Sequence, residues 1–137
     1  MIIYGIGNDI VEISRFKKIL QKNSLFKKRI FSKNEILYCE KKKLKIACYA
    51  KKFAAKEAFL KALGTGLIRG LKFKEITVIN DNLGKPLIKI VGNSLKIVKK
   101  ITKRKKINIF ISISDEKTHA ISTAIITSLW KINLKLL

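Results

Sequence analysis

The order of apolar and polar residues along the first half of the chain predicts a strand followed by three helices. Residues 2–6 read as a short buried strand that ends at the glycines of the sequence GIGND. A helix is expected over 10–22, where apolar residues recur at a spacing of three or four. These residues are Ile13, Phe16, Ile19 and Leu20. A second helix is expected to start near Ser32, because Ser32 and Glu35 have the spacing of a capping box.

The segment 46–63 is the strongest predicted helix of the chain. It contains neither glycine nor proline, is rich in alanine and leucine, and is followed by Gly64, a residue type that commonly ends helices. Alanine recurs in it at every fourth position, at Ala50, Ala54, Ala58 and Ala62. Such a stripe of small side chains lets a neighbouring element approach closely, so we expect this helix to pack against a sheet.

The second half of the chain predicts two pairs of antiparallel strands with a helix between them. A hairpin is expected over 74–79 and 86–91, joined by the turn-rich sequence NDNLGK. A basic helix capped by Asn93 or Ser94 should run to about residue 103, and two further strands are expected at 107–114 and 119–129. Strands and helices do not alternate as in βαβ units. The chain is therefore predicted to be α+β, with a mostly antiparallel sheet packed around the long helix, in one domain over 1–137.

Charge and cysteine content narrow the class of protein without identifying it. The 137 residues include 31 lysines and arginines against nine carboxylates, a net charge of +22. This charge indicates a polyanionic partner, or else a compositional bias towards lysine, and charge alone does not separate the two. No stretch is long and apolar enough for a membrane span, and the sequence MIIYGIGNDI has no basic leader. Cys39 and Cys48 match no metal-ligand spacing, so we expect reduced thiols in a cytoplasmic protein.

Two of the rare carboxylates are candidates for chemistry. Asp9 follows the first predicted strand, where it is either an N-cap with Glu12 completing a capping box or a functional group. Glu57 lies one helical turn before Lys61, so it either forms an exposed ion pair or borders the core and needs a cation. A carboxylate from a loop and one from a helix together suit Mg²⁺, which takes its other ligands from water and phosphates.

Basic residues and glycines close to Glu57 suit a polyphosphate ligand. Lys52, Lys56 and Lys61 lie on the same predicted helix, and Gly64, Thr65 and Gly66 follow it. The sequence has no complete G-x-G-x-x-G pattern and no P-loop, so no known nucleotide fingerprint accounts for these residues.

Five segments carry a resemblance that covers nearly the whole chain. They are GIGNDIVEISR at 5–15, FSKNEILYC at 31–39, KKFAAKEAFLKALGTG at 51–66, NDNLGKP at 80–86 and SISDEKTHAISTAII at 112–126. In these segments, and in their order, the sequence resembles the bacterial holo-[acyl-carrier-protein] synthases, the small type of 4′-phosphopantetheinyl transferase. The run from Phe53 to Gly66 is the most specific of them.

The resemblance implies a reaction. The enzyme would transfer 4′-phosphopantetheine from coenzyme A to a serine of an acidic apo acyl carrier protein, releasing 3′,5′-ADP, for fatty acid biosynthesis. It implies Mg²⁺ held by Asp9 and Glu57, with Lys61 against the coenzyme A phosphates, and these three residues would be catalytic. The residue that takes the serine proton stays open between Glu57 and a water on the metal.

The resemblance also implies where the substrates and other subunits bind. The coenzyme A site would be formed by Lys52, Lys56, Lys61, Gly64, Thr65, Gly66, Lys85 and Pro86. The assembly would be a homotrimer with active sites between subunits, and the carrier protein would meet Arg15, Lys18 and Lys22 on the first helix.

The sequence departs from this family in three places. Lys52 stands where many members have arginine, which keeps the charge but loses bidentate recognition of phosphate. Asp115 stands where many members have histidine, so an essential imidazole there is not expected. The C-terminal segment 127–137 is longer than usual, and no role is assigned to it.

Two non-enzymatic alternatives follow from the charge and the tail. A nucleic-acid-binding domain would bind DNA or RNA with strong salt dependence. Its basic residues would be expected on one face and interleaved with aromatic residues, a pattern that the sequence lacks. A membrane-surface protein would depend on the amphipathic tail SLWKINLKLL.

Overall fold

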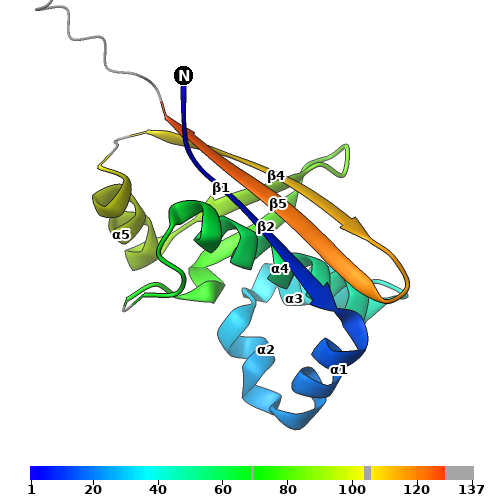
Figure 1. Ribbon diagram of the computed structural model, residues 1–137. Helices are drawn as coiled ribbons and strands as arrows, with labels where there is room; N and C mark the ends of the chain where they lie inside the picture. The colour runs from blue at the N-terminus through cyan, green and yellow to red at the C-terminus, as the bar shows by residue number, and fades with distance from the viewer. Residues whose placement is uncertain (69, 104–105, 129–137) are drawn as a thin grey trace, which may run out of the picture.

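The computed structural model describes residues 1–68, 70–103 and 106–128. Strand β1 (Ile2–Glu12) opens the chain and leads into four helices and a 3₁₀ turn at Phe73–Glu75 (Figure 1). The four helices are α1 (Ile13–Lys22), α2 (Ser24–Ile30), α3 (Lys33–Glu40) and α4 (Lys45–Leu63). The remaining elements are β2 (Ile76–Asn80), β3 (Pro86–Ile90), α5 (Gly92–Thr102), β4 (Ile107–Asp115) and β5 (His119–Ser128).

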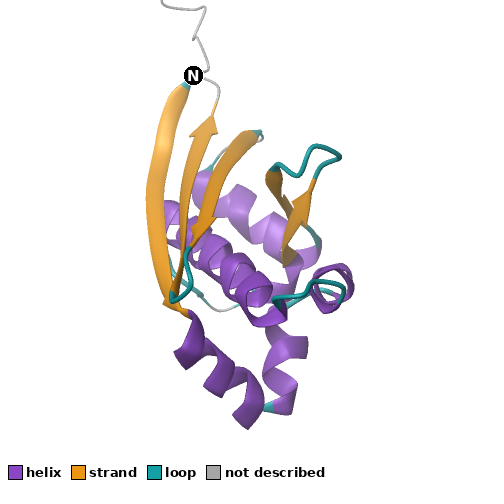
Figure 2. Ribbon diagram, turned by 90° about the vertical axis from the view of Figure 1, so that its right-hand side faces the viewer, coloured by secondary structure: helices purple, strands orange, loops and turns teal. Residues whose placement is uncertain are grey.

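The strands form two antiparallel sheets. One contains three strands in the order β1-β5-β4, and the other is the β2-β3 hairpin. Helix α4 packs against one face of the three-stranded sheet, and the other helices lie on the same side of it (Figure 2). Separate helices and antiparallel strands confirm the predicted α+β class. No helix of the described chain is both long enough and apolar enough to cross a bilayer.

The contact between β1 and α4 uses residues without large side chains on both elements. Gly5 and Gly7 face the helix, and a Cβ atom on either would overlap the helix backbone at Ala62 or Ala58. The alanines predicted to form a stripe are all buried, with Ala58 completely inaccessible and Ala62 at 4% exposure. The predicted close packing of this helix on a sheet is therefore confirmed, and it places the following residues of β1 beside α4.

The first strand is longer than predicted, and this changes the position of Asp9. The predicted strand ended at residue 6 and the predicted helix began at residue 10, whereas β1 continues to Glu12 and α1 begins at Ile13. Asp9 pairs with Ser122 of β5. Since the ladder with β5 fixes these residues in extended conformation, the interpretation of Asp9 as an N-cap is wrong.

The two predicted helix caps have different outcomes. Ser32 and Glu35 form the capping box, with Glu35 Oε2 accepting from the Ser32 amide at 2.8 Å and Ser32 Oγ accepting from the Glu35 amide at 3.3 Å. Helix α5 has no side-chain cap of its own. Glu75 instead accepts hydrogen bonds from the Ser94 amide at 2.9 Å and its hydroxyl at 2.6 Å, so the predicted cap by Asn93 or Ser94 is wrong.

The two cysteines form a disulfide bond. Cys39 near the end of α3 and Cys48 in the first turn of α4 have Cα atoms 5.5 Å apart. The expectation of free thiols is thereby corrected. Spacing along the sequence could not show it, because the pairing depends on how α3 folds back onto α4.

We expect Gly7→Ala to destabilise the protein by about 3 kcal/mol or more, because the added methyl group overlaps the α4 backbone. Strand β1 could move away only by breaking its hydrogen bonds to β5, and α4 only by breaking its own helical hydrogen bonds. Gly84→Ala is the matched control, since its Cβ meets nothing within 4 Å and its φ of 83° costs only about 1–2 kcal/mol. Urea unfolding followed by circular dichroism measures both. Equal losses in the two variants would contradict the close contact.

Candidate active site

Three charged side chains from β1 and α4 come together and form what we call the carboxylate centre: Asp9, Glu57 and Lys61. Lys61 Nζ donates a hydrogen bond to Asp9 Oδ1 at 2.8 Å. The Lys61 side chain is 53% exposed and that of Asp9 16%. The close packing of Gly7 on α4 brings these residues together, because Gly7 lies beside the Cβ of Lys61 and Asp9 is the next inward-facing residue of β1.

Glu57 has an unfavourable environment for a negative charge. Burial raises the pKa of its carboxyl above the usual value, the nearby Asp9 carboxylate raises it further, and Lys61 partly opposes both effects. Within the described chain, Glu57 makes no ion pair or side-chain hydrogen bond, and Lys61 pairs with Asp9 instead. The alternative of an exposed Glu57–Lys61 pair is therefore wrong. Glu57 borders the core and shares its site with a second carboxylate.

The donor atoms of the carboxylate centre fit a hard divalent cation. Glu57 lies close enough to Asp9 for the two carboxylates to repel each other, and Lys61 places a positive charge on an Asp9 oxygen. No cluster of three or more histidine, cysteine or carboxylate side chains occurs in the described ranges. Two carboxylates are nevertheless the usual protein contribution to a Mg²⁺ site that also binds phosphates. Asp9 and Glu57 are thus suitable for the predicted metal.

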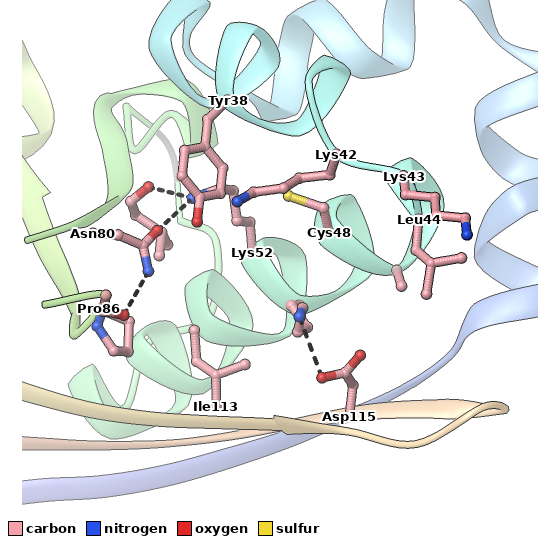
Figure 3. A pocket seen from close by; sticks show the side chains of 14 residues that line it. Tyr38, Lys42, Lys43, Leu44, Cys48, Lys52, Asn80, Pro86, Ile113 and Asp115 are labelled. Atoms are coloured by element: carbon pink, nitrogen blue, oxygen red, sulfur yellow. Dashed lines mark hydrogen bonds and ion pairs between the residues drawn. The ribbon is translucent and has the colours of Figure 1, made fainter.

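A second feature, which we call the lysine pocket, lies at the other end of α4. It is a cavity of 480 Å³ between α3, the first half of α4, the β2–β3 turn and the end of β4 (Figure 3). Four lysines line it: Lys42, Lys43, Lys51 and Lys52. Among the residues that line it, the only carboxylate is that of Asp115, which pairs with Lys51 at 3.2 Å. The pocket therefore carries an excess of positive charge that suits phosphate groups.

Lys52 reaches the lysine pocket from inside the protein. Its side chain is buried, and its Nζ donates to the Val78 carbonyl at 2.8 Å and lies 4.5 Å from the centre of the Tyr38 ring. Burial lowers its pKa to about 8, with Glu35 opposing the decrease. The group therefore stays charged at neutral pH. Its position on the pocket wall agrees with the prediction that it faces a polyphosphate.

Lys56 belongs to the core. It is completely buried, and its Nζ donates to the Ile30 carbonyl at 2.6 Å, to Glu35 Oε2 at 2.7 Å and to the Phe73 carbonyl at 2.9 Å. All three N–H groups of the ammonium are used within the protein. The prediction that Lys56 binds the coenzyme A phosphates is therefore wrong, because no donor remains for a phosphate.

The other predicted site residues divide between the two features. Gly64, Thr65 and Gly66 follow Lys61 at the end of α4, where Gly64 has a positive φ of 81° and ends the helix. Pro86 lines the lysine pocket, whereas Lys85 lies outside it, next to β4. None of the three residues of the carboxylate centre lines the lysine pocket. The structure therefore does not join the two features in one cavity of a single chain.

The residues predicted to bind the carrier protein are on the surface. Arg15, Lys18 and Lys22 are exposed on α1 at a spacing that puts them on one face.

Three lysines of the lysine pocket, Lys42, Lys43 and Lys51, were not among the predicted site residues. The run Lys41-Lys42-Lys43 before a strong helix was a possible signal, but lysine is so frequent in this chain that the run did not stand out.

Comparison with known proteins identifies the class. The family model described as the 4′-phosphopantetheinyl transferase superfamily matches residues 5–124, and the chain belongs to this superfamily. The holo-[acyl-carrier-protein] synthase of Pelagibacter ubique is 52% identical over 126 residues, which cover 92% of this chain and 98% of the relative. The resemblance to the holo-[acyl-carrier-protein] synthases is thus confirmed over most of the sequence.

Solved structures agree with this assignment. The holo-[acyl-carrier-protein] synthase of Neisseria meningitidis superimposes with a TM-score of 0.82 at 33% identity, covering 93% of this chain and all of that one (100%). The Helicobacter pylori synthase, solved in complex with coenzyme A, superimposes with a TM-score of 0.73 at 31% identity, covering 89% of this chain and 99% of that one. The family favours a transferase over a nucleic-acid-binding domain.

The charges of the carboxylate centre can be tested directly. We expect Asp9→Asn to lower the pKa of Glu57, because it removes a repelling charge and frees Lys61 to act on Glu57. Lys61→Met should raise the same pKa. Titration of the carboxyl ¹³C resonance of Glu57 measures both shifts in the metal-free protein. An unchanged pKa in Asp9→Asn would show that the two carboxylates do not interact.

Proposed function

We propose that the chain transfers the 4′-phosphopantetheine group of coenzyme A to a serine of an apo acyl carrier protein, in the cytoplasm and for fatty acid biosynthesis. The observation that carries this proposal is the carboxylate centre, in which β1 and α4 bring Asp9, Glu57 and Lys61 together in a member of the superfamily. The complex of the Helicobacter pylori relative with coenzyme A supports the choice of donor.

Asp9 and Glu57 would hold Mg²⁺. When bound, the ion would neutralise negative charge that develops on the pyrophosphate of coenzyme A. Lys61 supplies a second positive charge at the same place, and its exposed ammonium group can leave Asp9 for a phosphate oxygen. In the reaction, the serine hydroxyl gives its proton to Glu57 or to a water, the serine oxygen forms a bond to the β-phosphorus, and the bond from that phosphorus to the 3′,5′-ADP oxygen breaks. Positioning and charge are the main requirements of such a transfer.

The lysine pocket suits the nucleotide end of coenzyme A. Its four lysines provide charge for the 3′-phosphate, and Gly84 and Pro86 form a wall without charged side chains. Lys51 pairs with Asp115, the residue that replaces the frequent histidine of the family, so that position supports a lysine here instead of supplying an imidazole. This assignment makes Lys42, Lys43 and Lys51 part of the coenzyme A site.

The free face of the three-stranded sheet supports a homotrimer. Ile6 and Ile10 of β1, Phe110 of β4 and Ile121 of β5 point away from α4 and are 59%, 63%, 48% and 44% exposed. All helices lie on the opposite side (Figure 2). An apolar face of this kind is typical of an interface. The carboxylate centre lies at the β1 edge and the lysine pocket at the β4 edge, and head-to-tail contacts in a ring bring opposite edges together.

The basic face of α1 fits the acidic carrier protein. Arg15, Lys18 and Lys22 are exposed, and α1 follows directly on β1, which carries Asp9. Attraction between this face and an acidic protein would accelerate association and weaken as salt is added.

Activity is tested by the mass of the carrier protein. With coenzyme A and Mg²⁺, the chain should add about 340 Da, the mass of the phosphopantetheine group, to an apo acyl carrier protein. Asp9→Ala and Glu57→Ala should each slow the gain in mass at least about 100-fold. Each substitution removes a proposed ligand of Mg²⁺, whose charge would stabilise the transition state. Glu116→Ala, an exposed carboxylate outside both features, is the matched control. Full activity in both site variants, as judged by mass spectrometry, would contradict the proposed metal site.

Assembly is tested by a charge on the free sheet face. We expect Ile10→Asp to convert the trimer to monomers and to lower activity with it, since a carboxylate would be buried in an apolar interface. Leu37→Asp, on α3, changes a residue of similar exposure, 61% against 63%, away from the sheet, and should stay trimeric. Light scattering coupled to size-exclusion chromatography gives the masses. A monomeric unmodified protein with full activity would contradict the trimer.

A further inference from the structure

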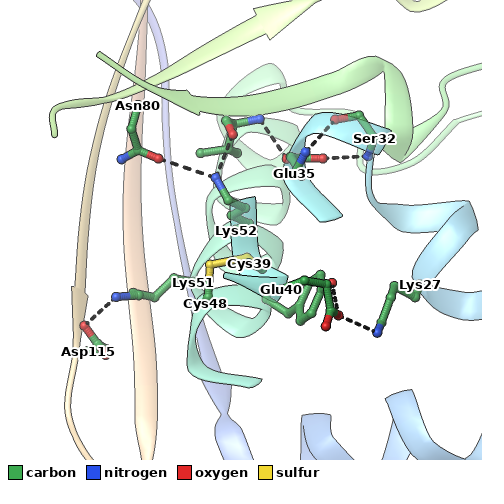
Figure 4. The surroundings of a disulfide bond; sticks show 12 residues. Lys27, Ser32, Glu35, Cys39, Glu40, Cys48, Lys51, Lys52, Asn80 and Asp115 are labelled. Atoms are coloured by element: carbon green, nitrogen blue, oxygen red, sulfur yellow. Dashed lines mark hydrogen bonds and ion pairs between the residues drawn. A yellow bond between two sulfur atoms is a disulfide. The ribbon is translucent and has the colours of Figure 1, made fainter. Parts of the chain in front are cut away.

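The disulfide is part of the wall of the lysine pocket. Cys48 lines the pocket and is 6% exposed, whereas Cys39 is completely buried behind it (Figure 4). The bond closes a loop over the segment 40–47. Within this segment, Lys42, Lys43, Leu44 and Ala47 all line the pocket. The pair therefore ties down the same residues that provide half of the pocket's lysines.

We propose that Cys39 and Cys48 are a thiol–disulfide exchange site whose oxidation state sets the affinity of the lysine pocket for phosphate-bearing nucleotides. The proposal rests on the proposed function for the cytoplasmic location and for the nucleotide of coenzyme A as the occupant. A disulfide in a cytoplasmic protein is usually transient and redox-sensing, because the compartment is reducing.

The surroundings of Cys48 suit reversible chemistry. Cys48 is 6% exposed, but it lines the lysine pocket, whose ammonium groups stabilise a thiolate. In the reduced protein, the Cys48 thiolate attacks a low-molecular-weight disulfide, forms a mixed disulfide and releases one thiol. Cys39 then attacks Cys48 and releases the second thiol. The two protein thiols lose two electrons and two protons, which the small disulfide takes up as it becomes two thiols.

The segment between the cysteines is also held at Glu40, which accepts hydrogen bonds from Lys27 Nζ at 3.0 Å, from Lys45 Nζ at 3.1 Å and from the Tyr49 hydroxyl at 2.7 Å. Lys42 is held by its amide, which donates to the Cys39 carbonyl at 3.0 Å, and by its side chain above the Tyr38 ring. Helix α4 begins at Lys45 without a side-chain cap on its first turn. Glu40 fixes the start of the segment, and the disulfide joins its two ends, so together they hold Lys42 and Lys43 in place before a ligand arrives. Loss of this preorganisation weakens binding, because the ligand must then order the segment.

The test uses the full chain and 3′,5′-ADP as the probe. The protein is oxidised with glutathione disulfide or reduced with a phosphine, and because it has only two cysteines its thiol count is either zero or two. Calorimetry should give binding about three- to tenfold weaker for the reduced form. The variant Cys39→Ser/Cys48→Ser should match the reduced form and should not respond to reductant. By reciprocity, bound 3′,5′-ADP should make the disulfide harder to reduce by the same factor.

The outcomes separate this inference from the proposed function. Equal affinity in the oxidised and reduced forms overturns the inference and leaves the proposed function standing. Binding in neither form overturns the inference together with the assignment of the pocket to the nucleotide, whereas the transfer reaction is judged separately by the mass gain of the carrier protein. If the double serine variant does not fold, the comparison of reduced with oxidised unmodified protein still decides the question. Lys43→Ala in the oxidised protein should weaken binding while its thiol count stays at zero.

Discussion

The contact between the glycine backbone of β1 and the alanine face of α4 determines where every candidate catalytic residue lies. Gly5 and Gly7 approach the helix so closely that no side chain fits between them. Strand residues alternate between faces, so the next inward position after Gly7 is Asp9. On α4, Glu57 and Lys61 lie next to Asp9. A close approach of two backbones thus converts two distant segments into one charged centre, and a single added methyl group would separate them.

The buried pair of Lys56 and Glu35 fixes the rotation of α4 about its axis. Lys56 is bonded to two backbone carbonyls and to Glu35, which also accepts from the Val78 amide at 2.8 Å. Removing one member would leave the other charge buried without its partner, at a cost of about 3–5 kcal/mol. Adjacent helical residues point about 100° apart. With Lys56 held in the core, Glu57 faces β1 and cannot turn inward, so a structural ion pair positions the candidate carboxylate beside it.

The local patterns of the sequence predicted most elements, and the wrong structural predictions share one cause. The capping box at Ser32, the helix ending at Gly64 and both hairpins depend on neighbouring residues and were correct. Four predictions were wrong, and each concerned a feature that depends on contacts between residues at least nine positions apart in the sequence. These features are the end of β1, the cap of α5, the disulfide and the burial of Lys56. Asp9 and Glu57 were predicted as candidates because carboxylates are rare here, and Lys61 was added by the family resemblance. Lys42, Lys43 and Lys51, which line the lysine pocket, were not predicted, because a single lysine carries little signal in a chain where lysine is so common.

The division of the site along α4 lets its two parts vary separately. Lys51 and Glu57 are six residues apart, which is about 9 Å along a helix. The carboxylate centre needs hard oxygen donors in a fixed arrangement, and here it rests on backbone packing that tolerates little change. The lysine pocket needs only positive charge and a stable wall, which Lys52, the Lys51–Asp115 pair and the disulfide supply in place of arginine and histidine. Lys52 and Asp115, the two departures from the family that lie within the described chain, both line the pocket, and neither is one of Asp9, Glu57 and Lys61.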